Sequence, residues 1–241
     1  MDACLSKLSK RRVFKKEELF EVAKDSGKAT GVSAMEKYLS RLLKNGEIAR
    51  VGRNAYCLKG ELRVYRFQYT DISEHIADIL LREFYDLDFR IMEMYQLNGF
   101  VNHQIAHNII FVYVEKEVST AVFERLKKDY AGKILINPTE EIFYNYRSDD
   151  MVVVRNLVSE SPKGFDVKWH TGLEKLLVDV FAERLVRSML AESEYKQIFE
   201  TAFQNYVIDE SGMFRYANRR KNTIAIKKFL TEETAVELRV G

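Results

Sequence analysis

The chain has 241 residues, of which 46% are hydrophobic and 31% charged, a composition that excludes a disordered protein and is typical of a globular one. The longest apolar run, residues 109–114, is too short to cross a bilayer, and no secretory signal follows Met1. We therefore expect a cytoplasmic protein without a membrane partner. Two cysteines, Cys4 and Cys57, supply neither a disulfide framework nor a four-ligand zinc set.

The net charge of +2 conceals a division along the chain. Residues 1–59 contain 14 Lys and Arg against 7 Asp and Glu, which is a net charge of +7. Residues 60–241 contain 24 against 29, which is a net charge of −5. A basic segment on an acidic remainder suggests that nucleic acid binds at one end. We expect two domains, one over residues 1–60 and one over residues 61–241.

The first domain begins with a predicted helix over residues 2–10 and a short strand at Val13 and Phe14. A second helix is predicted over residues 16–24, where the apolar positions follow helical spacing and Asp25-Ser26-Gly27 supplies a turn. A third helix follows Gly31, with Ser33 as the expected N-cap and Glu36 three residues later.

A hairpin follows the third helix. Strands are predicted over residues 47–51 and 55–58, around a turn at Gly52-Arg53-Asn54. Two helices followed by a hairpin with basic residues near its tip is the order of parts in a winged helix-turn-helix. That module places its second helix in the major groove of DNA, so the sequence predicts a DNA-binding domain.

The third predicted helix has two different sides. Apolar residues recur at the spacing of a core face: Met35, Tyr38, Leu39, Leu42 and Leu43. Polar and basic residues share the other side: Ser33, Lys37, Ser40, Arg41 and Lys44. We predict that this second side reads a double-stranded DNA groove, and that Arg50, Arg53 and Asn54 in the wing contact a neighbouring phosphate or the minor groove. A merely solvated helix face has the same composition, and this alternative stays open.

The second domain is predicted to mix strands and helices. Predicted strands cover residues 62–67, 88–96, 108–115, 133–136 and 151–156. Predicted helices cover residues 72–84 (capped by Ser73), 120–130, 173–191, 194–206 and 219–230. This order of elements predicts a mixed α/β or α+β fold.

Several segments resemble the AbiEi-type antitoxins. The resemblance is carried by YLSRLLKNGEIARVGRNAYCL, IIFVYVEKE, MVVVRNLVSESPKG and TGLEKLLVDVFAERL. It implies a divergent member of a family of winged-helix transcriptional regulators from type IV toxin–antitoxin systems. Such a protein binds promoter DNA and represses its own operon, while its C-terminal domain acts against a separately encoded nucleotidyltransferase-like toxin. The resemblance also implies a C-terminal fold similar to the restriction-endonuclease core.

An enzyme is the main alternative function. A nuclease core needs an acidic residue on one strand and Asp/Glu-x-Lys on the next, and Asp150 with Asp166-Val167-Lys168 has that formal spacing. Asp166 follows a loop signature rather than opening a strand, so we predict no catalytic residue. His103 and His107 lie four residues apart without an obvious third ligand, which predicts no metal site. The sequence contains no Gly-rich phosphate loop, and we expect no cofactor.

A second basic cluster lies near the C-terminus: Arg215, Arg219, Arg220, Lys221, Lys227 and Lys228. It is a candidate for an extended DNA footprint or for an acidic partner protein, and a solvated helix face is the alternative. We expect the second domain to form a homodimer, to sense a ligand or to bind a partner. A further alternative is an interaction scaffold in which the winged helix binds protein instead of DNA.

Overall fold

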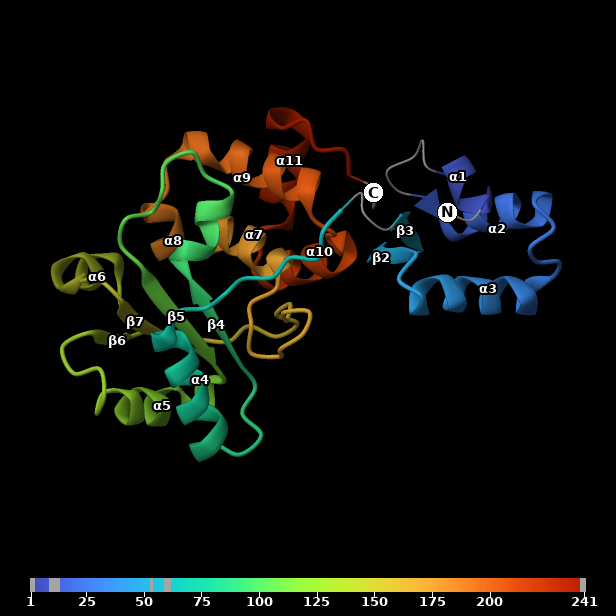
Figure 1. Cartoon of the computed structure of the whole chain (residues 1–241). Helices are drawn as coiled ribbons and strands as arrows, with labels where there is room; N and C mark the ends of the chain where they lie inside the picture. The colour runs from blue at the N-terminus through green and yellow to red at the C-terminus, as the bar shows by residue number, and fades with distance from the viewer. Residues whose placement is uncertain (1–2, 9–13, 53, 59–61, 239–241) are drawn as a thin grey trace.

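The computed structural model describes residues 3–8, 14–52, 54–58 and 62–238. We call residues 3–58 the head and residues 62–238 the body. Figure 1 shows the head at one end of the molecule and helices α5 and α6 of the body at the other end. The predicted mixed α/β class is confirmed, because helices combine with two separate sheets.

The head contains three helices and a three-stranded sheet. In chain order these are α1 (Ala3–Leu8), β1 (Phe14–Lys15), α2 (Lys16–Asp25), α3 (Val32–Lys44), β2 (Ile48–Gly52) and β3 (Ala55–Leu58). The strands are antiparallel in the order β1-β3-β2. One apolar cluster holds these elements together, and α3 contributes Met35, Tyr38, Leu39 and Leu42 to it. This is the predicted arrangement of helices and hairpin.

Two details of α3 differ from the prediction. The helix is capped by Gly31, whose φ of 100° is open to glycine, so Ser33 is not the N-cap but the second residue of the helix. Leu43 was predicted to belong to the core stripe, but its side chain is 36% exposed. It lines a cavity between the head and the body, which a view of the isolated helix cannot reveal.

The body is built on a four-stranded sheet of β4 (Phe89–Glu93), β5 (Ile109–Val114), β6 (Ile134–Ile136) and β7 (Met151–Asn156). The order is β4-β5-β7-β6, with β4 antiparallel to β5 and the other neighbours parallel. Every residue of β5 is buried, because the sheet is covered on both faces. Alternate side chains of β5 therefore enter two different apolar clusters.

Eight helices of the described body make the outer layers. They are α4 (Asp71–Glu83), α5 (Ser119–Leu126), α6 (Glu140–Tyr146), α7 (Leu173–Ala182), α8 (Arg184–Ser188), α9 (Glu192–Asn205), α10 (Glu210–Arg219) and α11 (Thr223–Glu233). Helices α4 and α5 pack on one face of the sheet, and α7 to α11 pack on the other (Figure 1). Two short 3-10 helices, Met94–Gly99 and Lys116–Val118, complete the body.

The strand predicted over residues 62–67 is wrong. Within residues 62–67 the structure has only isolated bridge residues, Leu62 and Arg63, the latter bridged to Tyr206, and no strand. Tyr65 and Phe67 pack instead into the two apolar clusters of the body, one on each side. Tertiary packing of these aromatic side chains thus replaces the strand that their propensity favoured.

The helix predicted over residues 173–191 is divided at Glu183, whose backbone is extended with φ −93° and ψ 111°. The buried Glu183 carboxylate accepts hydrogen bonds from Arg155 and Arg220, and these long-range contacts compete with continuous helix. The helix predicted over residues 219–230 is observed as α11, which begins at Thr223, and α10 before it was not predicted. Ser73 lies inside α4 rather than at its cap, which is Thr70, and α6 was not predicted.

None of the described helices is both long enough and apolar enough to cross a membrane. The implied resemblance of the body to a restriction-endonuclease core stays a prediction.

Candidate nucleic-acid interface

Helix α3 separates its apolar side from its polar side. Met35, Tyr38, Leu39 and Leu42 are between 0% and 6% exposed and point into the head. The residues predicted to read DNA are all exposed: Ser33, Lys37, Ser40, Arg41 and Lys44. We call these five residues the α3 polar face. The separation follows from helical periodicity, since both sets repeat at three and four residues.

The α3 polar face carries three cations, and two of them have no acidic partner in the described part of the chain: Lys37 and Lys44. The guanidinium of Arg41 lies 5.1 Å from the ring centroid of Tyr38, which holds the Arg side chain along its own helix. Cations presented on a helix that is anchored by its opposite side are suited to phosphate oxygens and to base edges in a major groove.

A neighbouring acid is neutralised within the head. Glu36 lies beside the α3 polar face and forms an ion pair with Lys16 of α2. The hydrogen bond to Glu36 raises the pKa of the Lys16 ammonium. This ion pair links α2 to α3. Because Glu36 is paired with Lys16, the lysines of the α3 polar face remain exposed to solvent.

The wing residues have different surroundings. The backbone of Asn54 has a φ of 61°, and its side-chain amide donates to both oxygens of Glu17 at 2.8 Å. Asn54 was predicted to contact DNA, and here it connects the turn of the wing to the start of α2. Arg50 is exposed on β2 and lines the cavity between head and body. Arg53 lies outside the described residues.

The second basic cluster is divided by its own acidic neighbours. Arg219 donates to Glu160 at 2.6 Å, and the Arg215 guanidinium lies 3.8 Å from the same carboxylate. The side chain of Arg220 is only 13% exposed and faces Asp179 at 3.6 Å. The three arginines therefore have carboxylate partners inside the body.

The three lysines of this cluster also have local surroundings. Lys227 lies 5.1 Å from the ring centroid of Phe214, and Lys228 faces Glu232 of the same helix at 3.8 Å. Lys221 adopts a φ of 57° where the chain turns from α10 to α11. The pairing of the arginines and the local contacts of the lysines weaken the interpretation of this cluster as one cationic surface, and its role stays a prediction.

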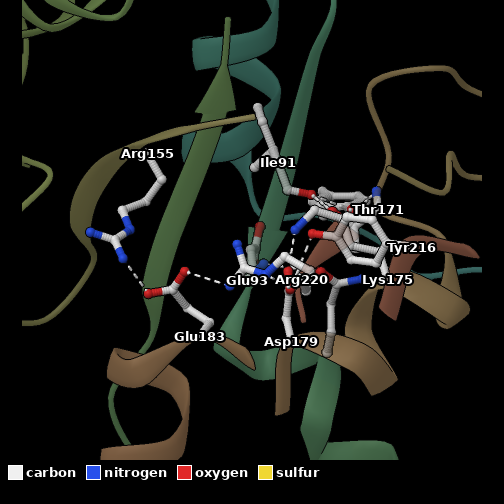
Figure 2. A network of polar contacts seen from close by, with 11 residues as sticks. Ile91, Glu93, Arg155, Thr171, Lys175, Asp179, Glu183, Tyr216 and Arg220 are labelled. Carbon is white, nitrogen blue, oxygen red and sulfur yellow. Dashed lines mark hydrogen bonds and ion pairs between the residues drawn. The ribbon is translucent and has the colours of Figure 1, made fainter. Parts of the chain in front are cut away.

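A buried polar network lies on the opposite face of the sheet from α4 (Figure 2). Lys175 and Asp179 of α7 form an ion pair with both side chains fully buried. The hydroxyl of Tyr216 donates to Asp179 at 3.1 Å, and the Lys175 ammonium lies 3.4 Å from the ring centroid of Tyr113. Burial lowers the pKa of Lys175, because desolvation disfavours the charged ammonium, and Asp179 opposes this shift.

Glu183 extends the network to the sheet. Arg155 of β7 donates to its carboxylate at 2.5 Å, and Arg220 donates to it at 3.3 Å. Sequence analysis did not identify this network, although α7 offered a signal. Apolar residues occur on all sides of its sequence LEKLLVDVFA, which is typical of a buried helix. A charged side chain on such a helix needs a partner, because burying an unpaired charge is costly.

Three of the residues considered for catalysis or metal binding have contacts with other side chains: Asp166, His103 and His107. Asp166 lies in an irregular segment, where its carboxylate accepts from Arg66 at 2.5 Å, and the pKa of Asp166 is lowered by that contact. His107 is bound by Asp149, and His103 lies 3.9 Å from Glu194. Within the described ranges, no three His, Cys, Asp or Glu residues are arranged to hold a metal ion.

Comparisons with known proteins give family matches for the head and for most of the chain. Residues 5–59 match the model of a family described as "Transcriptional regulator, AbiEi antitoxin", which confirms the resemblance for this segment. No curated protein matches the chain. A solved structure, the RV2827C protein from Mycobacterium tuberculosis, is 11% identical, with a TM-score of 0.27 over 97% of this chain and 81% of that chain. Residues 34–236 match a family model described only as a family of unknown function, DUF6577. The chain therefore belongs to the family DUF6577 and carries at its N-terminus a segment of the AbiEi regulator type.

Proposed function

We propose that the protein is a DNA-binding transcriptional regulator that inserts α3 into a major groove. The observation that carries the proposal is the α3 polar face, whose cations stand exposed opposite a fully buried apolar stripe. Lys37, Ser40, Arg41 and Lys44 are the residues proposed to reach bases or phosphates. The match of residues 5–59 to a transcriptional-regulator family supports the same function.

We propose further that it acts in the cytoplasm as an antitoxin-like autorepressor, with residues 1–60 as the DNA-binding domain. Residues 61–241 would then bind a partner, either a nucleotidyltransferase-like toxin or a second copy of the chain. The support for this finer proposal is the match of residues 5–59 to a family of AbiEi antitoxin regulators. Co-purification of the protein with the product of an adjacent nucleotidyltransferase-like gene would test it.

Fluorescence anisotropy tests the DNA-binding proposal. The duplex to use is the DNA immediately upstream of the protein's own reading frame, with a shuffled duplex of equal length as competitor. Variants Lys37→Ala and Lys44→Ala should each weaken binding and reduce the salt slope by about 1, since each cation neutralises one phosphate. The matched control is Lys128→Ala, an exposed lysine in the turn that follows α5, and α5 lies at the far end of the molecule from the head (Figure 1).

Three results would contradict the proposal. DNA binding that does not depend on salt would contradict a role for the α3 polar face. So would a loss of affinity in Lys128→Ala as large as the loss in Lys37→Ala or Lys44→Ala. Mg²⁺-dependent cleavage of plasmid that disappears in Asp166→Ala would replace regulation with an enzymatic function. We propose that no such cleavage occurs, since Asp166 is held by Arg66 in a loop rather than beside a second acid.

A further inference from the structure

A cavity of about 580 Å³ lies between the head and the body. Its head wall is formed by the end of α3 and by the hairpin, through Leu43, Gly46, Ile48, Ala49, Arg50 and Leu58. Its body wall includes Leu62, Val64, Tyr65, Leu173 and Val207. A mostly apolar cavity of this volume, set where two units of a chain meet, has the size and position of a small-molecule site.

Two carboxylates stand in the apolar body wall. Glu174, in the first turn of α7, accepts a hydrogen bond from the backbone N–H of Asp209 at 2.8 Å. Asp209, which precedes α10, lines the cavity with it. Neither carboxylate has a basic partner among the residues that the structure describes. Burial raises the pKa of Glu174, and the charge of Asp209 adds to this effect. An acidic pair without a counter-ion therefore faces an apolar space.

Two basic residues also line the cavity, Lys163 and Arg50, and neither forms an ion pair with Glu174 or Asp209 among the described residues. Lys163 lies 3.3 Å from the Asp88 carboxylate and is thereby engaged outside the cavity. Arg50 belongs to the head wall, on β2. Phe165 also lines the cavity; it is 71% exposed, and the Arg66 guanidinium lies 5.5 Å from its ring centroid. Two carboxylates without a basic partner among the described residues, set in an apolar wall, favour a ligand with a positive charge and an apolar body.

We propose that this cavity binds a small organic amine whose apolar part fills the space between the hairpin and the body and whose ammonium group pairs with Glu174 and Asp209. The ammonium donates hydrogen bonds to Glu174 and Asp209 and supplies the counter-charge that these two carboxylates lack among the described residues. The apolar part packs on Ile48, Leu58 and Val207 and removes their surface from water. Since its walls come from both the head and the body, the bound amine contacts both.

Calorimetric titration of the full chain tests the site with three probes of similar size that share a phenyl group: phenethylamine, 2-phenylethanol and 3-phenylpropionate. The amine should bind about tenfold more tightly than the alcohol, and the anion should bind most weakly. Glu174→Gln and Asp209→Asn should each remove most of the preference for the amine and leave the affinity for the alcohol nearly unchanged. Glu141→Gln, an exposed acid on α6, is the matched control and should change nothing.

A third variant tests the location independently of charge. Ala49→Phe fills the cavity from the head wall and should abolish binding of all three probes, with far-UV circular dichroism confirming that the variant is folded. Three results would overturn the proposal: an amine that binds no more tightly than the alcohol, full binding by Ala49→Phe, or tightest binding by the anion, which would make Arg50 the anchor. Because no DNA is present, these outcomes are independent of the proposed regulatory function.

Discussion

Lys175 and Asp179 lie one turn apart on α7 and form an ion pair that solvent does not reach from either side. Asp179 also accepts a hydrogen bond from Tyr216 and faces Arg220, so it is the shared acceptor of the network (Figure 2). We expect Asp179→Ala to lower the free energy of unfolding by about 3–5 kcal/mol, because it leaves a buried ammonium without a counter-ion. Urea denaturation monitored by circular dichroism measures this change.

The control for this prediction is an ion pair with the same helical spacing but an exposed position. Lys228 and Glu232 lie 3.8 Å apart, with side chains 69% and 60% exposed. Glu232→Ala should change stability by less than about 1 kcal/mol, since solvent screens the pair. Equal effects of Asp179→Ala and Glu232→Ala would contradict the inference that burial gives the first pair its importance.

Tyr113 presents an unusual hydroxyl, which is buried and has no hydrogen-bond partner in the described chain. Its ring nevertheless contacts the Lys175 ammonium, and phenylalanine would keep that contact. We expect Tyr113→Phe to leave stability at pH 7 unchanged or to raise it by up to about 1 kcal/mol, because it removes an unsatisfied polar group. Tyr216→Phe is the comparison and should be destabilising, since it loses the bond to Asp179. Destabilisation by Tyr113→Phe would show that its hydroxyl has a partner.

Alkaline pH should destabilise the protein. Burial raises the pKa of Tyr65, Tyr69, Tyr113 and Tyr216 in the folded chain. An unfolded tyrosine titrates near pH 10, so above about pH 10 the unfolded chain loses protons that the folded chain keeps. Stability must then fall as pH rises. The lowered pKa of Lys175 acts in the opposite direction, but only up to the ordinary lysine value near pH 10.4.

Urea denaturation at pH 9, 10 and 11 checks this dependence, and absorbance at 295 nm reports which tyrosines ionise. Part of the tyrosine absorbance change should appear only with unfolding. A free energy of unfolding that stays constant between pH 10 and 11 would contradict the prediction.

Arg41 of the α3 polar face allows a distinction between two kinds of DNA contact. If its guanidinium pairs with a base edge, Arg41→Ala should cost about 1–3 kcal/mol on the specific duplex and less on a shuffled duplex. Equal weakening on both duplexes would identify a phosphate contact. Competition anisotropy at one fixed salt concentration separates the two outcomes, and Lys128→Ala is again the control.

The Asn54–Glu17 contact predicts how the wing tolerates substitution. Asn54 has a left-handed backbone, and the hydrogen bond it donates lowers the pKa of Glu17. Glycine adopts a positive φ without strain, so Asn54→Gly preserves the backbone conformation, whereas Asn54→Ala adds strain of about 1–2 kcal/mol. The melting temperature should therefore be lower for Asn54→Ala than for Asn54→Gly. The opposite order would show that the positive φ is not required.

Much of the fold was predictable where the information is local. The strand at residues 151–156 was predicted with its observed bounds, because an uninterrupted apolar run bordered by polar residues marks it. The two sides of α3 were also predicted, since periodicity alone places Met35 and Lys37 on different sides. The α3 polar face is therefore a sequence-level prediction whose exposure the structure describes, while its contact with DNA stays a prediction.

Other features were missed because they depend on distant parts of the chain. The division of the predicted helix 173–191 coincides with Glu183, whose partner Arg155 is 28 residues earlier in the sequence. The spacing of Lys175 and Asp179 predicts an i, i+4 ion pair, and that spacing is the same whether the pair is buried or exposed. Only the packing of α7 between the sheet and α10 distinguishes a buried pair from an exposed one.

The sequence alone determined the basic head, the amphipathic α3 and the mixed α/β class, because charge, helical period and turn residues act between near neighbours. Tertiary structure decided which charges are buried, that Leu43 and Arg50 face a cavity, and that Glu174 and Asp209 line it without a basic partner among the described residues. These depend on segments more than a hundred residues apart coming together. Burial and charge pairing are properties of that assembly, and no short stretch of the chain contains them.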